Sequence, residues 1–92
     1  MNRFDILLLE CINKLASENI SEGVEALVDF AHEMAKCGYS QKEFAELRQY
    51  IIQEAHYLSK NPNTLIIKIE LAEREQNANR AKHRRQQIIT SH

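Results

Sequence analysis

The 92-residue sequence predicts a small all-α protein, and three observations support this fold class. Apolar residues recur at helical spacing along several segments. Two glycines and one proline leave little turn material, whereas β-sandwiches and barrels need a turn signal about every ten residues. The apolar fraction of 43% is typical of a globular chain and too high for general disorder. We therefore expect an antiparallel bundle of three short helices and a long C-terminal helix that extends beyond the core.

The first two helices are expected over residues 3–18 and 21–37. Ser21 is the predicted N-cap of the second helix, and Gly38 stands where a helix C′ glycine belongs. Each segment has an apolar face at the i, i+3, i+4 spacing, with Ile6 and Leu9 at the margins of the first. The two predicted faces consist of Phe4, Leu7, Leu8, Cys11, Ile12 and Leu15, and of Val24, Leu27, Val28, Ala31, Met34 and Ala35.

The third helix, expected over residues 41–60, has the clearest start signal. Ser40 and Glu43 have the spacing of a capping box, and Tyr39 and Phe44 have that of a hydrophobic staple. The helix should end by Asn61-Pro62, because a residue before proline is disfavoured in the α region. Its predicted buried face consists of Phe44, Leu47, Ile51, Ile52, Ala55 and Leu58.

Residues 35–47 resemble the first half of a helix-turn-helix of the phage-repressor type, in which a similar Gly-x-Ser-Gln-x-Glu run opens the helix before the recognition helix. That family requires a tight turn a few residues after the position of Leu47. Residues 48–53 instead continue with helical periodicity and contain no glycine or cap. We therefore explain the resemblance by a shared capping box and do not assign the chain to this family.

Residues 65–71 fit two secondary structures. Ile67 to Leu71 alternate as in a β-strand, yet no second segment could pair with such a strand. Leu65, Ile66, Ile69 and Ala72 fit one face of a helix, which Asn63 could cap so that it begins near Thr64. We predict the helix.

The chain is expected to divide into a bundle domain, residues 1–72, and a polar extension, residues 73–92. Between residues 73 and 87 there is no large apolar side chain, so this part cannot bury a core face and should project into solvent or order on a partner. The formal charge of −1 conceals a gradient, since residues 1–60 carry −4 and residues 61–92 carry +3.

No pattern in the sequence predicts catalysis, a cofactor or a metal site. The histidines at 32, 56, 83 and 92 lack neighbouring ligands at metal-binding spacing, and Cys11 and Cys37 are expected to be buried or half-buried thiols. No signal peptide is recognisable, no apolar stretch approaches the ~20 residues of a membrane span, and two thiols do not make a disulfide framework. We expect a cytoplasmic, non-enzymatic protein with no membrane or small-molecule partner.

The predicted function is that of a small regulatory or adaptor protein, for example an inhibitor of a larger complex. It would act through helix-mediated contact with a protein partner or with a second copy of itself. The motivation is a second apolar ridge on the fourth helix, formed by Ile67 and Leu71 opposite the core stripe. The predicted interface residues are Ile67, Leu71, Arg74, Ile88 and Ile89, with Tyr50 and Tyr57 secondary.

The alternative function is a nucleic-acid-associated regulator. It would use the basic residues of the extension to contact phosphates, and each contact would add to the salt dependence of binding. No aromatic residue is interleaved to stack on bases, and an acidic protein surface would suit the same charges. The residues concerned are Arg80, Lys82, Arg84 and Arg85, with His83 between them.

Overall fold

A computed structural model describes residues 2–90 of the chain, with side chains for residues 2–79. The backbone forms four helices, namely α1 (Arg3–Ala16), α2 (Ile20–Lys36), α3 (Gln41–Leu58) and α4 (Pro62–Thr90). Residues 2–90 contain no strand, so the predicted all-α class is confirmed and residues 65–71 are helical rather than extended. The uninterrupted α3 also shows no turn after Leu47, where a helix-turn-helix would need one.

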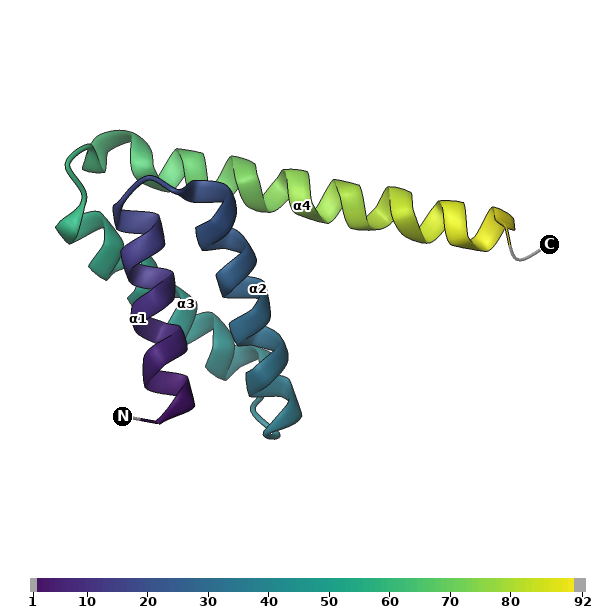
Figure 1. Cartoon of the computed structure of the whole chain (residues 1–92), viewed down its shortest axis with the longest axis horizontal. Coiled ribbons are helices and arrows are strands. Elements are labelled where there is room, and N and C mark those ends of the chain that lie inside the picture. The colour runs from purple at the N-terminus through teal and green to yellow at the C-terminus, as the bar shows by residue number, and fades with distance from the viewer. Residues whose placement is uncertain (1, 91–92) are drawn as a thin grey trace.

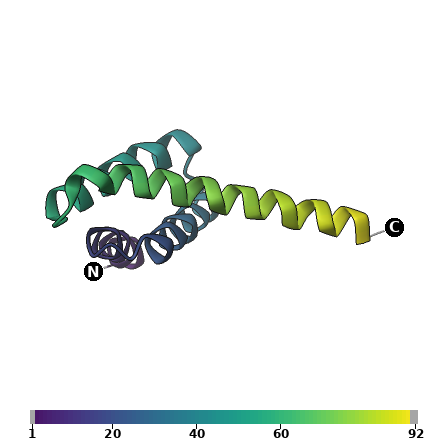
Figure 2. The same ribbon diagram turned by 90° about the horizontal axis from the view of Figure 1, so that it is seen from above.

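The helices pack in two layers. Figure 1 shows α1 and α2 running side by side in opposite directions, with α3 crossing behind them. From above, α3 and α4 lie on one side and the α1–α2 pair on the other (Figure 2). The first turns of α4 pack on α3 and α2, and its second half runs past α2 and away from the other helices (Figure 1).

The turn between α1 and α2 is earlier and tighter than predicted. Glu18 adopts a left-handed conformation with φ of 64°, and the amide of Asn19 donates to the carbonyl of Lys14 at 3.0 Å. This Schellman-type closure reverses the chain within three residues. The next helix therefore starts at Ile20 with Asn19 as N-cap, and the prediction of Ser21 as the cap is wrong.

The boundary between α2 and α3 follows the prediction. Gly38 has φ of 88°, and the amide of Tyr39 donates to the carbonyl of Met34 at 3.1 Å, which closes α2 with a Schellman motif. The capping box of α3 is present, since the Glu43 amide donates to Ser40 Oγ at 3.1 Å and the Glu43 carboxylate accepts from the Ser40 amide. Tyr39 stacks edge-on against Phe4, with 6.0 Å between ring centroids.

Helix α4 begins two residues before the predicted position. The proline that ends the preceding segment is itself the first residue of α4, a position where its fixed φ suits the helix and its missing N–H costs no hydrogen bond. Helix α3 ends at Leu58, two residues before the predicted boundary, and the Ser59 hydroxyl accepts a hydrogen bond from the Asn61 amide at 3.1 Å. The connection between the two helices is therefore only three residues long.

The core takes one apolar stripe from each helix, and the predicted stripes of α2, α3 and α4 need correction. Phe30 and Ala26 are core residues that the predicted face of α2 omits. Ala35, Leu58 and Ile66 were predicted on buried faces and are exposed, Leu58 to 56% and Ile66 to 42%. Leu58 stands at the last position of α3, where it lines an open depression with the end of α1 and the two chain turns. The buried side chains are Cys11, Ile12, Leu15, Val24, Ala26, Leu27, Phe30, Met34, Ile51, Ile52, Ala55, Leu65 and Ile69.

Candidate interaction surfaces

The first candidate surface is the outward face of α4. On the inner face of this helix Leu65 and Ile69 are fully buried. On the outer face Ile67 is 59% exposed and Leu71 is 52% exposed. Arg74, one turn further on, is also exposed. We call Ile67, Leu71 and Arg74 the α4 ridge. Two large aliphatic side chains on successive turns give an apolar strip that the bundle leaves uncovered.

The two tyrosines of α3 do not extend this ridge. Arg48 faces α4, where it bonds Glu73, and Tyr50 lies about 200° further round the helix. Tyr57 is two turns from Tyr50 on the same outer face and is 84% exposed. The structure therefore separates the tyrosines from Ile67 and Leu71 instead of joining them into one surface.

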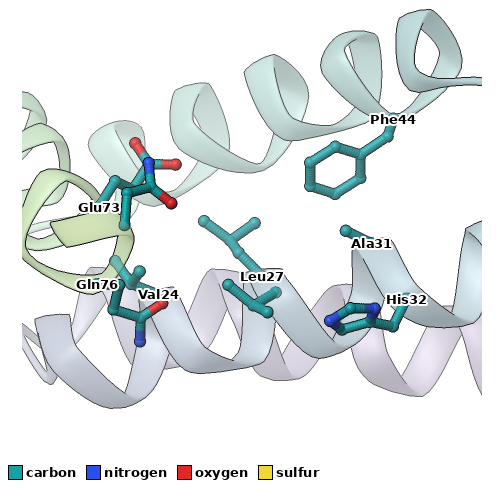
Figure 3. Close-up of a pocket in the computed structure, with 9 residues that line it drawn as sticks. Val24, Leu27, Ala31, His32, Phe44, Glu73 and Gln76 are labelled. Carbon is teal, nitrogen blue, oxygen red and sulfur yellow. The ribbon is translucent and has the colours of Figure 1, made fainter. Parts of the chain in front are cut away.

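The second candidate surface is a groove of about 230 Å³ between α2, the start of α3 and the middle of α4. We call it the α2 groove. Two further depressions adjoin it along α2, one beside Glu25 and Asp29 and one beside Ala35 and Tyr39. Figure 3 shows its walls, with Val24 and Gln76 at one end and His32 and Phe44 at the other. The lining residues are Val24, Leu27, Val28, Ala31, His32, Phe44, Glu73, Gln76 and Asn77.

The groove exists because α2 turns its core face further toward α1 than the predicted stripe implies. Gly23 allows the close approach of these two helices, since a Cβ at this position would lie 2.5 Å from Leu15 Cδ2. Phe30 then points into the core and packs edge-on against Phe4. As a result, Val28 and Ala31 are left half-buried, and Ala35 is exposed. The sequence does not predict that these residues lie at the surface, because their helical spacing is also that of a core face.

The edge of the groove is set by an ion pair between α3 and α4. Arg48 Nε donates to Glu73 Oε2 at 2.8 Å, and a second bond joins the guanidinium to the other carboxylate oxygen. This hydrogen bonding raises the pKa of Arg48. The pair holds α4 against α3 at the point where Glu73 lines the groove.

Gln76 is the polar residue that the groove leaves unsatisfied. Its Oε1 atom is buried and has no hydrogen-bond donor among the described residues. An amide carbonyl in this condition costs about 1–3 kcal/mol compared with a bonded one. Gln76 also lines the adjoining depression, together with Glu25 and Asp29.

Six predicted contact residues lie outside the part of the chain whose side chains the structure describes, namely Arg80, Lys82, Arg84, Arg85, Ile88 and Ile89. The same holds for His83 and His92. His32 and His56 are exposed, and Cys37 is exposed rather than half-buried because it caps the open end of α2. Burial raises the pKa of the Cys11 thiol to about 11.

Within the described residues no three His, Cys, Asp or Glu side chains are grouped so that they could hold a metal ion. The helices there also include none with the length and apolar character of a membrane span. Comparisons with protein-family models, with curated proteins and with solved structures find no match to this chain.

Proposed function

We propose that this chain is a small, non-enzymatic regulatory or adaptor protein that acts by helix-mediated protein–protein contact. The observation that carries the proposal is the α4 ridge, because Ile67 and Leu71 lie on the face of α4 opposite its fully buried residues. A helix that packs on a bundle needs only one apolar face. Burial of a second apolar face against another protein removes that face from water and so stabilises the complex. Arg74 adds a charged end of the kind found at interface rims.

Three features of the chain support this class over an enzyme. The α2 groove and its adjoining depression beside Ala35 and Tyr39 are lined by helix side chains, with Tyr39 and Ser40 the sole loop residues among them. The thiol with a raised pKa is buried in the core, and thiolate chemistry needs an accessible group of lowered pKa. Helix α4 also continues far beyond the residues that pack on the bundle, as a partner-binding helix would (Figure 1).

The alternative of a nucleic-acid contact rests on the basic residues beyond position 79. The described part of the chain adds little to it. Five of its eight Lys and Arg residues are engaged in ion pairs, and the other three, Lys42, Lys60 and Arg74, lie apart at the start of α3, beyond its end and on α4. A phosphate-binding surface requires several cations free on one face. We therefore place this function second.

The proposed function is tested with the double variant Ile67→Glu, Leu71→Glu. Both side chains are more than half exposed, so the variant should keep the helical circular dichroism of the wild type. It should lose the protein that co-purifies with the tagged wild-type chain. The matched control is Glu70→Lys, Glu75→Lys, which changes two exposed residues of the same helix that are in no ion pair with another described residue, and it should retain the partner. Equal capture by the double variant and the control would refute a contact through the α4 ridge.

A further inference from the structure

We infer that the α2 groove receives the C-terminal segment of α4, residues 80–90, from a second copy of this chain. The inference deepens the proposed function, on which it rests for the helix-mediated mode of contact, by naming one partner. It concerns the groove rather than the α4 ridge, so the two can fail separately. Four properties of the groove and of the segment support it.

The first property is shape. The part of the wall that α2 leaves accessible includes Val28, Ala31, His32 and Ala35, which occupy the i, i+3, i+4 and i+7 positions of one helix face. Three of these side chains are small and only partly covered. Small residues on one face let the backbone of another helix approach closely, which is the geometry of helix-in-groove recognition.

The second property is length. From Glu25 to Ala35 the groove and its adjoining depressions follow α2 over ten residues, or about 15 Å. The segment 80–90 is helical in backbone and about 16 Å long. The segment therefore matches the groove from end to end.

The third property is charge. Glu25 and Asp29 stand at the end of the groove beside Gln76, and neither is in an ion pair with another described residue. Residues 80–92 contain four Arg and Lys residues and no acidic residue. An arginine or lysine of an incoming segment would meet the two carboxylates and form charge-assisted hydrogen bonds with them. Ile88 and Ile89 would then meet the apolar end of the groove near Phe44.

The fourth property is topology. Helix α4 is continuous from Pro62 to Thr90, and its second half runs away from α2 of its own chain (Figures 1 and 2). A segment that continues an unbroken helix cannot turn back to lie along α2. A second copy can supply it, and a two-fold axis lets each copy fill the groove of the other.

The test is the mass of the full chain in solution, measured by sedimentation equilibrium at low salt. The wild type is expected to be a dimer whose dissociation constant rises with salt. The variant Glu25→Lys, Asp29→Lys and the variant Arg84→Glu, Arg85→Glu should each weaken the dimer at least tenfold. A chain that carries all four changes should dimerise again, because the charge pairs are restored in the opposite sense. The control Glu46→Lys, Glu70→Lys changes exposed acids away from the groove and should leave the dimer intact.

Carbodiimide coupling of the wild type gives a second measurement that does not depend on the folding of any variant. With one isotope-labelled and one unlabelled copy, cross-links from Glu25 or Asp29 to Lys82 should join the two isotopic forms. A wild type that is monomeric at all concentrations would overturn the inference. So would a dimer that survives both charge reversals and dissociates with Ile67→Glu, Leu71→Glu, since this dimer would form through the α4 ridge. Loss of nucleic-acid binding on Arg84→Glu, Arg85→Glu with no change in mass would also overturn it.

Discussion

Arg48 on α3 and Glu73 on α4 are joined by two hydrogen bonds, with Arg48 Nε 2.8 Å from Glu73 Oε2. Both side chains are about one third exposed or less, so water screens this pair less than the other interhelical pair, between Arg3 and Glu33. The pair holds α4 against α3 near the middle of α4. Gln76 and Asn77, which still line the α2 groove, follow one turn later.

The first prediction concerns this pair. A double-mutant cycle on Arg48→Ala and Glu73→Ala, measured by urea unfolding, should give a coupling energy of about 1 kcal/mol, because the bonds are bidentate and partly shielded. The exposed pair Arg3 and Glu33 serves as the control, and its coupling should stay below about 0.5 kcal/mol. Equal coupling in the two cycles would show that the shielding has no effect.

The second prediction concerns the left-handed residue of the first turn. Glu18→Gly should be more stable than Glu18→Ala by about 1 kcal/mol, since both lose the carboxylate contacts to Asn61 and Lys68 but only glycine is unstrained at a φ of 64°. The comparison is made by thermal unfolding of the two variants. A more stable alanine variant would mean that the turn relaxes when the side chain is shortened.

The third prediction concerns the contact between α1 and α2. Helix propensity favours alanine over glycine by about 1 kcal/mol, so propensity would make Gly23→Ala stabilising. We expect instead a loss of about 1–2 kcal/mol, because the new methyl group would lie 2.5 Å from a buried Leu15 methyl and the Leu15 backbone leaves little room to retreat. Urea unfolding decides the sign, with Ser21→Ala on the exposed face of α2 as the reference.

The fourth prediction concerns pH. Burial raises the pKa of the Cys11 thiol from 9.0 to about 11, so the unfolded chain ionises this thiol first as the pH rises. The free energy of unfolding should therefore be unaffected by this group below pH 9 and should fall by about 2 kcal/mol by pH 11. The control is Cys11→Ala, which lacks this thiol but keeps the tyrosines and lysines that also titrate in this range. Its free energy of unfolding should lack the part of the pH dependence that Cys11 causes. Parallel stability curves for the two chains between pH 8 and 11 would contradict the prediction.

Local signals in the sequence determined the helix class and the boundary between α2 and α3. Ser40 with Glu43 and Gly38 act within one turn of the backbone, so their spacing is enough to recognise a capping box and a C′ glycine. The turn at Glu18 was placed incorrectly because glutamate gives no sign of a left-handed conformation. Pro62 correctly predicts a break between two helices. The sequence signal places it at the end of the third helix, whereas it is the first residue of α4.

The α2 groove, by contrast, was decided by tertiary packing. Apolar residues at helical spacing give the same sequence pattern whether or not another helix covers them. The pattern therefore predicts that Val28, Ala31 and Ala35 belong to the core. Their exposure depends on how far α2 rotates toward α1, which Gly23 and Phe30 set through contacts with residues on another helix. The outward face of α4 was visible beforehand, because Ile67 and Leu71 stand opposite Leu65 and Ile69 on any regular helix. A sequence specifies the faces of each helix through local periodicity, whereas the covering of a face depends on contacts between residues far apart in the chain.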